Sequence, residues 1–424
     1  MAPRGAVLQS ATGRPCVTRP MLQPIEPMRE RRNFVRLLGG GLAVAAGATA
    51  LATWWLHADV PAAAFEIWNG PGDEPDVRKR AVAYAVTAPT AYNGQPWRVD
   101  LREPDAIVLH ADRARVQPAT DPFGRQLMIG HGAFIELLVM ALAQQGVQAR
   151  VQLWPQGELV GDAPQQWPDL PVARLTLSRG GTPDPLFAQV LRRRTPKQRF
   201  DTGRRVSADM LQGLTAAVAS ASSGGVQSAG TVDMARVLPL RKLCAAAARV
   251  ELVTPHTARE NLRLLRIGPQ EILAHRDGFS LNDPALRMAV ALGRFDREVP
   301  AAEDSLSFRQ TLRMFEDQAH TAMGFVWIST GGNSRSEQIA AGRAYVRQQL
   351  RATDLGLGMQ PMSQPLEEFP EMAPHHAAAH DMLIGAAPSR HARSPTVQMM
   401  CRLGFPTAPV PPAPRRPVGD FMQA

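Results

Sequence analysis

The run from Arg192 to Arg199 concentrates side chains that bind anions. It reads Arg192-Arg193-Arg194-Thr195-Pro196-Lys197-Gln198-Arg199, and its lysine is one of only three in the chain. A second basic pair, Arg415 and Arg416, lies more than 200 residues further on. Planar guanidinium groups neutralise and orient a phosphate monoester better than point charges do. The pattern predicts a phosphate site built from remote segments, and the alternative is a helix end exposed to water.

An ordered loop is predicted between Pro89 and Trp97. Two prolines and an Asn-Gly pair fall within these nine residues, and such residues interrupt helices and strands and fix the path of a loop. We expect Gln95 to hold the loop in place and the indole of Trp97 to belong to the hydrophobic core.

The loop and the arginine run together resemble two motifs of the flavin-dependent nitroreductase superfamily. Pro89-Thr90-Ala91-Tyr92-Asn93-Gly94-Gln95-Pro96-Trp97 is similar to its P-S-x-x-N-x-Q-P-W loop, with Thr in place of Ser, and Arg193-Arg194-Thr195-Pro196-Lys197 is similar to its R-[RH]-S-x-[RK] phosphate motif. Residues 357–365 resemble the segment that faces the flavin ring, and residues 411–417 resemble the basic C-terminal stretch. The order of the motifs is similar to that of the Acg-like branch, in which two nitroreductase halves are fused. The similarity extends from about Asp76 to Asp420.

This resemblance implies an FMN-dependent oxidoreductase that passes hydride or electrons through flavin N5 to a nitro, quinone or similar acceptor. Carried over by position, it implies that the FMN phosphate is held by Arg193, Arg194, Thr195, Lys197, Arg415 and Arg416. It implies that the isoalloxazine and ribityl groups lie along Pro89, Thr90, Ala91 and Asn93, and that the edge near N5 is approached by Gln360, Pro361 and Met362. The alternative is a protein that binds and sequesters flavin without turnover. No side chain is an evident proton donor, so no catalytic acid is named.

The chain departs from the superfamily pattern in ways that affect the site. The spacing from Lys197 to Phe200 is one residue longer than in the standard motif, so either Lys197 or Arg199 reaches the phosphate. The first half lacks a phosphate motif and the second half lacks the N-x-Q-P-W loop. Each half therefore supplies a different part of one site, and we expect one FMN per chain.

Alternating helical and strand patterns predict an α+β chain of two units that arose by duplication, residues 61–182 and 183–424. The resemblance implies that they are two fused, pseudo-symmetric halves of a nitroreductase-like fold. A helical insertion is expected over about 256–320, and the Pro-rich tail from Phe405 is expected to wrap across the body. Helices are expected at 77–86, 125–145, 184–193, 207–219, 234–252 and 335–352, and strands at 98–101, 106–111, 149–153, 172–178, 323–329 and 357–362.

Residues 1–60 are expected to form a disordered n-region and an export signal outside the fold. Arg31-Arg32-Asn33-Phe34-Val35-Arg36 precedes twenty residues without a charge, 37–56, and resembles a twin-arginine signal with a cleavage site near Ala50-Leu51-Ala52. Retention as a membrane anchor is the alternative, because twenty apolar residues can span a bilayer. Export by the twin-arginine machinery would place the protein in the periplasm or on the outer side of the cytoplasmic membrane.

Composition and charge exclude other classes of protein. With 45% hydrophobic and 20% charged residues the chain is globular, and much of its net charge of +9 lies in residues 1–36, which hold seven Arg against two Glu. The remainder is too weakly basic for a nucleic-acid surface. Cys244 and Cys401 could pair, but free buried thiols are expected. His375, His376, His380 and Asp381 could bind a metal, although a surface helix without one is preferred.

Overall fold

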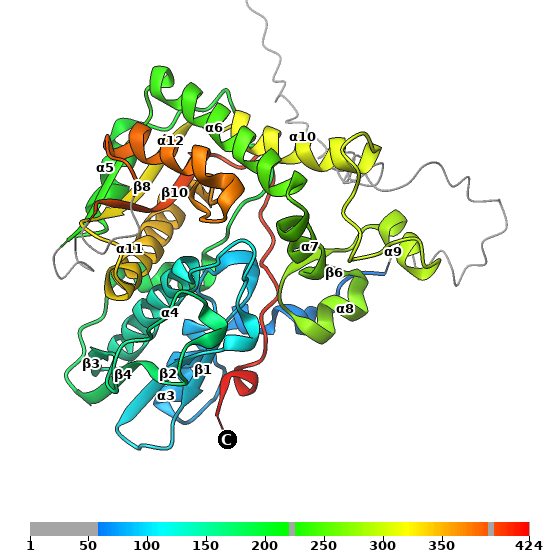
Figure 1. Cartoon of the computed structure of the whole chain (residues 1–424). Coiled ribbons are helices and arrows are strands. Elements are labelled where there is room, and N and C mark those ends of the chain that lie inside the picture. The colour runs from blue at the N-terminus through cyan, green and yellow to red at the C-terminus, as the bar shows by residue number, and fades with distance from the viewer. Residues whose placement is uncertain (1–57, 220–224, 389–393, 424) are drawn as a thin grey trace, which may run out of the picture.

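The computed structural model describes residues 58–219, 225–388 and 394–423 (Figure 1). The predicted export signal lies outside these residues. Within them, helices and antiparallel sheets together form the body of the protein, and the α+β prediction is confirmed.

The first half contains one sheet and one long helix. Its elements are η1 (Ala62–Asn69), α3 (Val77–Ala85), η2 (Ala91–Asn93), β1 (Trp97–Asp100), β2 (Ala106–Ala111), η3 (Arg113–Arg115), α4 (Arg125–Gln144), β3 (Val147–Leu153), η4 (Pro164–Gln166) and β4 (Pro171–Arg179).

The second half contains a second sheet and most of the helices. Its elements are η5 (Pro185–Arg192), α5 (Ala208–Ala216), β5 (Val226–Thr231), α6 (Met234–Val253), α7 (Pro255–Arg263), β6 (Leu265–Ile267), α8 (Gly268–His275), β7 (Phe279–Leu281), α9 (Pro284–Ala291), α10 (Leu306–His320), β8 (Gly324–Thr330), α11 (Arg335–Asp354), β9 (Gly358–Pro361), η6 (Gln364–Leu366), η7 (Pro370–Met372), α12 (Ala373–Ile384), β10 (Thr396–Gly404) and η8 (Val418–Phe421).

The two four-stranded sheets have the same strand order. The order is β1-β2-β4-β3 in the first half and β5-β8-β10-β9 in the second, and all neighbouring strands are antiparallel. In each sheet the fourth strand of the half therefore lies between the second and the third. A long helix joins the second strand to the third in both halves, α4 in the first and α11 in the second. A diverged duplication would produce this layout, while the boundary between residues 182 and 183 stays a prediction.

Helices α4 and α11 pack against each other at the centre of the molecule, and two glycines make their approach close (Figure 1). A Cβ on Gly132 would lie 2.0 Å from the carbonyl oxygen of Ile339, and a Cβ on Gly342 would lie 1.9 Å from that of Ile129. Each glycine thus meets the residue three positions before the other glycine, so the contact has a two-fold pattern. Only glycine leaves room for backbones at this distance.

The halves differ in what joins their first two strands. Residues 101–105 join β1 to β2, whereas residues 232–323 join β5 to β8 and contain α6 to α10 and the parallel pair β6-β7. The insertion therefore begins with α6, earlier than the predicted residue 256. In Figure 1 α7 and α8 stand beside the first half, and the carboxylate of Glu260 accepts hydrogen bonds from the amides of Ala119 (2.9 Å) and Thr120 (3.0 Å) there.

Several predictions about individual residues are confirmed. Trp97 is fully buried against the rings of Phe134 and Phe421, at 4.8 and 6.0 Å between ring centres. Cys244 and Cys401 are buried free thiols. Helix α4, which is long and apolar enough to cross a membrane, is a largely buried core helix of the described structure.

Other predictions about the elements were wrong. The segment expected as a helix at 184–193 is a 3-10 helix, η5, and strands β5 and β10 were not predicted. Strand β10 is buried at every position although it contains Gln398 and Arg402, so no alternation marks it in the sequence. Helix α12 has exposed residues such as Pro374 and Asp381, but His380 lies on its buried face, where its ring accepts a hydrogen bond from the amide of Val397 at 3.1 Å.

Candidate cofactor site

Four cations from two remote segments form one group, which we call the cation cluster: Arg193, Arg194, Lys197 and Arg415. The guanidinium carbons of Arg193, Arg194 and Arg415 lie 5.7, 4.4 and 5.4 Å from the ring centre of Trp68. The ammonium of Lys197 lies 4.2 Å from the ring centre of Phe279 in the insertion. The structure thus brings together the arginine run and the first tail arginine, as the sequence predicted.

The local sequence explains why the arginine run is not part of a helix. Helix η5 ends at Arg192, and Arg193 adopts an extended conformation with φ −58° and ψ 131°. Pro196 disfavours helical geometry at the residue before it, Thr195. The chain therefore turns inward, and Arg193 is only 2% exposed. For Arg193 the alternative of a helix end exposed to water is wrong.

Neutral oxygen atoms are the hydrogen-bond partners of Arg193. Its Nη1 donates to Oε1 of Gln349 at 2.7 Å and to the hydroxyl of Thr195 at 3.2 Å, and its Nη2 donates to the carbonyl oxygen of Thr87 at 2.9 Å. Its Nε is buried and has no partner in the described residues. The side chain is held in place while its charge stays uncompensated.

Arg415 joins the tail to the first half. Its Nε donates to the carbonyl oxygen of Val86 at 3.0 Å, its Nη2 donates to that of Thr87 at 3.3 Å, and its Nη1 donates to Oδ1 of Asn93. The amide of Asn93 in turn donates to the carbonyl oxygen of Pro414 at 3.1 Å. Asn93 and Arg415, more than 300 residues apart, therefore touch directly.

The cation cluster lacks negative charge. Among the residues that the structure describes, no carboxylate forms an ion pair with any of its four members, and the cations act on one another. Burial, and then the charges of Arg193 and Arg194, hold the pKa of Arg415 well below its ordinary value. Burial lowers the pKa of Arg193 to about 10. An anion at this place would relieve the repulsion, and a phosphate dianion offers both charge and acceptors.

Lys197 lies at the exposed side of the cation cluster. Its side chain remains accessible to water, yet the surrounding protein lowers the pKa of its ammonium to about 8 by desolvation, with a smaller contribution from the charge of Arg415. Arg199, the other candidate for the same role, forms an exposed ion pair with Asp317 on α10 at 2.8 Å. This geometry favours Lys197 over Arg199 as the partner of a phosphate.

Three residues of the predicted loop have left-handed backbone conformations, although none is glycine. The φ angles are 49° for Tyr92, 55° for Asn93 and 51° for Gln95. The side-chain Nε2 of Gln95 donates to the carbonyl oxygen of Arg276 at 2.8 Å, and its Oε1 accepts from the backbone N–H of Arg416 at 3.0 Å. Gln95 fixes the loop as expected, and a backbone strained in this way is typical of a functional site.

The beginning of the loop runs along α4. Pro89 is buried, and the methyl group of Thr90 lies so close to Gly130 that a Cβ on that glycine would be 3.2 Å away. The hydroxyl of Thr90 accepts a hydrogen bond from the amide of Gln95 at 3.2 Å. Ala91 begins the single turn of η2. These residues form the wall of the first half beside Asn93.

Gln360, Pro361 and Met362 lie at the edge of the second sheet, and their described contacts are made there. Gln360 accepts a hydrogen bond from Nε of Arg402 at 2.7 Å and donates to Gln318 at 2.8 Å, while Met362 is buried in the core. Arg402 also donates to the carbonyl oxygen of Gln198 at 2.6 Å, so this edge is joined to the arginine run. The approach of these three residues to a flavin stays a prediction.

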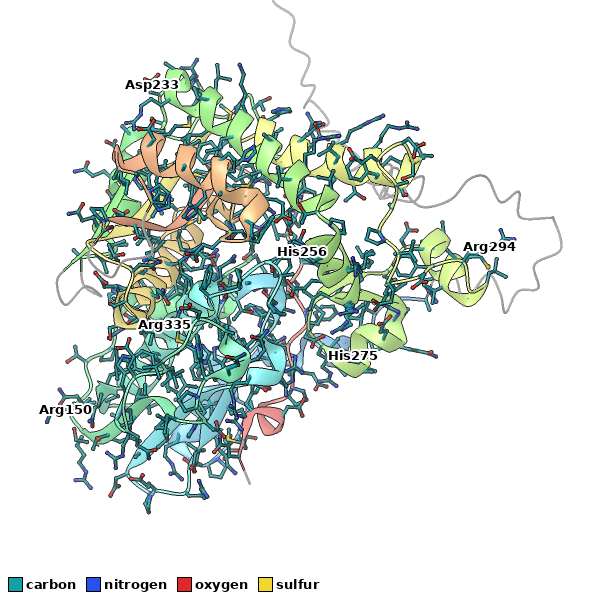
Figure 2. All side chains as sticks on the ribbon, in the orientation of Figure 1. Arg150, Asp233, His256, His275, Arg294 and Arg335 are labelled. Carbon is teal, nitrogen blue, oxygen red and sulfur yellow. The ribbon has the colours of Figure 1, made fainter. Side chains whose placement is uncertain are left out.

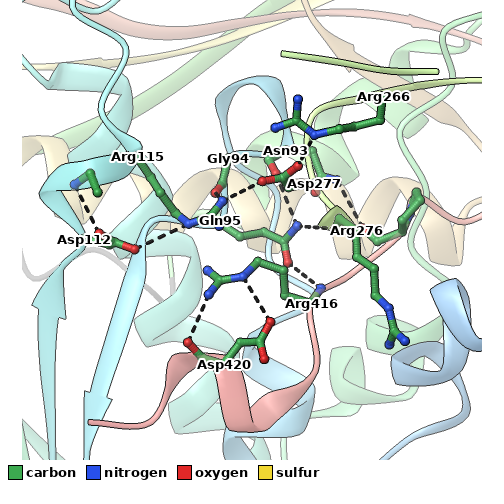
Figure 3. Close-up of polar contacts among 12 residues, drawn as sticks. Asn93, Gly94, Gln95, Asp112, Arg115, Arg266, Arg276, Asp277, Arg416 and Asp420 are labelled. Carbon is green, nitrogen blue, oxygen red and sulfur yellow. Dashed lines mark hydrogen bonds and ion pairs between the residues drawn. The ribbon is translucent and has the colours of Figure 1, made fainter. Parts of the chain in front are cut away.

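Arg416 separates from its neighbour Arg415. Figure 3 shows its side chain turned toward Asp420, which accepts from Nη2 through its carbonyl oxygen at 3.0 Å, and its guanidinium lies 4.6 Å from the ring centre of Phe421. It lines a cleft together with Gly94 and Arg115. In the described structure Arg416 is not a member of the cation cluster.

A buried pair of carboxyl groups adjoins the loop and was missed by sequence reasoning. The hydroxyl of Tyr92 lies 2.6 Å from Oε1 of Glu251 and 3.2 Å from Oε1 of Glu367, and both glutamates are at least 98% buried. Burial, and then the charge of Glu251, raises the pKa of Glu367 well above its ordinary value. Burial also raises the pKa of Glu251. Both carboxyl groups therefore favour the protonated form more strongly than a glutamate in water does.

Trp68 was also missed, since a lone tryptophan 21 residues before the loop carries no motif. Its indole N–H donates to the carbonyl oxygen of Ala413 at 2.7 Å, which seats the tail against η1.

Known proteins similar to this chain include two from Mycobacterium tuberculosis. The protein named "Putative NAD(P)H nitroreductase Rv3131" is 26% identical over 357 residues, which cover 81% of this chain and 90% of that protein. The chain is similar to a nitroreductase along most of its length. The protein named "Putative NAD(P)H nitroreductase acg" is 40% identical over 80 residues, which span 19% of this chain and about a quarter (24%) of that protein. The similarity to Rv3131 supports a place in the nitroreductase superfamily, and the Acg-like branch stays a prediction.

Solved nitroreductase structures are more distant. The FMN-dependent nitroreductase NfnB of Mycobacterium smegmatis in complex with NADPH is 16% identical, with a TM-score of 0.33, over 55% of this chain and 94% of that one. The nitroreductase with bound FMN from Bacteroides fragilis is 14% identical, with a TM-score of 0.30, over 54% of this chain and 92% of that one. No family model matches the chain.

Proposed function

We propose that the protein is an FMN-dependent oxidoreductase of nitroreductase type, which uses a small-molecule electron donor and reduces a nitro, quinone or similar acceptor. The observation that carries the proposal is the cation cluster: Arg193, Arg194 and Arg415 meet around Trp68, with Lys197 beside them, and no carboxylate pairs with them in the described structure. The similarity to nitroreductases along the chain supports it independently.

The residues of the chain fit the phosphate end of FMN. Arg193, Arg194, Lys197 and Arg415 supply charge, and the unpartnered Nε of Arg193 supplies a donor. The bound flavin would supply hydride exchange at N5. The loop residues Pro89, Thr90, Ala91 and Asn93 would bound the ribityl and ring region, because Asn93 already touches Arg415.

The test is to purify the protein, record its visible spectrum, release the bound flavin and count it per chain. The proposal expects a flavin spectrum and one FMN per chain. A well-folded, colourless protein that does not take up added FMN would overturn it.

A second candidate function is flavin binding without turnover. The observation that favours it is the contact of the insertion with the site: Phe279 packs on Lys197, and the amide of Gly278 donates to the carbonyl oxygen of Asn93 at 3.4 Å. An anaerobic assay separates the two. If the bound flavin is neither reduced by NADH, NADPH or a small artificial reductant nor reoxidised by a nitroaromatic, the sequestering function holds and the enzyme is excluded.

The proposal includes export by the twin-arginine route, to the periplasm or to the outer side of the cytoplasmic membrane, with residues 37–56 cleaved or retained as an anchor. Support comes from the Arg31-Arg32 pair and the uncharged run behind it. Because reduced nicotinamides are scarce outside the cytoplasm, an exported enzyme would need another donor. Cell fractionation of the Arg31→Lys, Arg32→Lys double variant should show the protein held in the cytoplasm, with Arg29→Lys as the exported control. Unchanged export of the double variant would exclude this route.

A further inference from the structure

A cleft of about 760 Å³ lies beside the candidate cofactor site, between residues 112–119 of the first half and residues 256–278 of the insertion. Figure 2 shows His256 and His275 on the side of the insertion that faces the first half. Gly94 and Arg416 also line the cleft, so its wall is the outer side of the cofactor loop and of the tail. Clefts of this size commonly bind small organic molecules rather than single ions.

The acidic groups of the cleft are already engaged. Asp277 pairs with Arg115 at 2.7 Å and with Arg266 at 2.6 Å, as Figure 3 shows. Glu260 accepts from two backbone amides and from the hydroxyl of Thr120. Asp112, the third acid, pairs with Arg115 at 3.4 Å. These contacts join the insertion to the first half and leave little acceptor capacity for a cationic ligand.

Cationic donors of the cleft remain open. The exposed Arg259 makes one hydrogen bond in the described structure, from Nε to the carbonyl oxygen of Pro255 at 3.1 Å, so its terminal nitrogens donate to no group there, while its charge helps to lower the pKa of the exposed Glu298. Nη1 of Arg416 is buried and has no partner among the described residues, while its Nε lies 3.5 Å from Oδ2 of Asp420. Desolvation, and then the charge of Arg115, lowers the pKa of Arg416. Guanidinium nitrogens that are left without an acceptor in this way favour an anionic ligand.

The cleft also has apolar surface. Val116 and Pro118 contribute it from the first half and Leu264 from the insertion, and the imidazoles of His256 and His275 add flat rings. An anion that matches both features carries a phosphate and a flat, weakly polar ring system. We propose that this cleft binds a nucleoside phosphate, with Arg259 and Arg416 as the contacts of the phosphate. The site is separate from the cation cluster, and its occupation does not depend on the proposed flavin chemistry.

Isothermal titration of the purified full chain with ADP, with adenosine and with inorganic phosphate tests the site. We expect saturable binding of ADP, and binding of adenosine or phosphate alone that is at least tenfold weaker. Absence of saturable ADP binding would overturn the proposal, and so would phosphate that binds as tightly as ADP, since the cleft would then select an anion only.

Two variants locate the binding. Arg259→Gln should weaken ADP binding about tenfold or more, because a charge-assisted hydrogen bond is lost, whereas the exposed Arg309→Gln on α10 should not. Ala114→Glu places a negative charge in the cleft and should abolish binding, while its neutral counterpart Ala114→Gln should retain it. Equal ADP affinity of Ala114→Glu and Ala114→Gln would also overturn the proposal.

Flavin content, measured on the same samples, keeps the two proposals apart. A colourless protein that binds ADP would refute the flavin function and leave this site intact. A protein that contains flavin but does not bind ADP would refute this site and leave the flavin function intact.

Discussion

The two halves of the molecule have the same sheet topology but contribute different segments to the candidate cofactor site. Both have the same strand order, and α4 and α11 meet through equivalent glycines. Yet the first half contributes the strained loop around Asn93, whereas the second contributes the arginine run, the tail and the insertion between β5 and β8. The symmetric parts of the molecule thus hold its body together, whereas the asymmetric connections bring the cation cluster and the loop around Asn93 to one place.

The largest expected effect comes from replacing Gly132 and Gly342, the two glycines at the contact between α4 and α11. Gly132→Ala and Gly342→Ala should each lower the free energy of unfolding by about 3 kcal/mol, because a Cβ would collide with a backbone carbonyl that cannot move aside. Urea denaturation measures both. Gly331→Ala is the control, since a Cβ there meets nothing within 4 Å. Clearly unequal losses at the two glycines would mean that the contact is not symmetric in energy.

The tail arginines test whether the site is as asymmetric as the structure indicates. Arg415→Gln should weaken FMN binding about 100-fold, because it removes a buried charge and its hydrogen bonds to the loop. Arg416→Gln should weaken it less than threefold, since that side chain turns toward Asp420. Fluorescence titration of the apoprotein with FMN gives both constants. If both variants weaken FMN binding equally, Arg416 also contributes to the phosphate site.

The carboxyl pair predicts how stability depends on pH. The folded-state pKa values of Glu251 and Glu367 are raised, so their contribution is fully present below the ordinary pKa of glutamate, near 4.3, and is lost as pH rises toward the folded values. Asp121, with a pKa of about 6, likewise contributes less stability as the pH rises. Buried His131 and His380, with pKa values of about 4, instead contribute less stability as the pH falls below 6.5.

Comparing variants isolates the pair from these other groups. Above pH 5, ionisation of Glu367 should lower the free energy of unfolding of the wild type by up to about 1.4 kcal/mol per pH unit. Glu367→Gln should not show this decrease. Glu66→Gln, at an exposed position, is the control for the loss of one carboxyl group. Chemical denaturation between pH 5 and 8 measures the profiles, and identical slopes for wild type and Glu367→Gln would contradict the raised pKa of Glu367.

The smallest expected effect concerns the insertion. Phe279→Ala removes the ring that packs on Lys197 and meets Tyr92 edge-on at 5.3 Å. Release of FMN should become about three- to tenfold faster, the value of one aromatic contact, with little change in melting temperature. Stopped-flow dilution measures the rate, and Phe295→Ala, which lies elsewhere in the insertion, is the control. An unchanged rate would mean that the insertion does not retain the cofactor.

The sequence predicts those parts of the fold and site that depend on neighbouring residues. The pattern of α4 and α11 is local, the loop is marked by its prolines and Asn-Gly pair, and the arginine run is marked by its charge and its resemblance to a phosphate motif. Strand β5, with Gln, Ser and Gly among six residues, has no such pattern. The pairing of Glu251 with Glu367 depends on three chain segments that meet only in the folded protein, so nothing local could reveal it.

Because Arg415 lies near the end of the chain, the candidate cofactor site is completed late in synthesis. Arg415 and the carbonyl of Ala413 that anchors Trp68 leave the ribosome after both sheets, whose last strand ends at Gly404. Synthesis thus delivers the final cation when the scaffold is already available to receive it. A chain that stopped shortly after β10 would contain both sheets but would lack Arg415, and we expect it not to retain the proposed FMN.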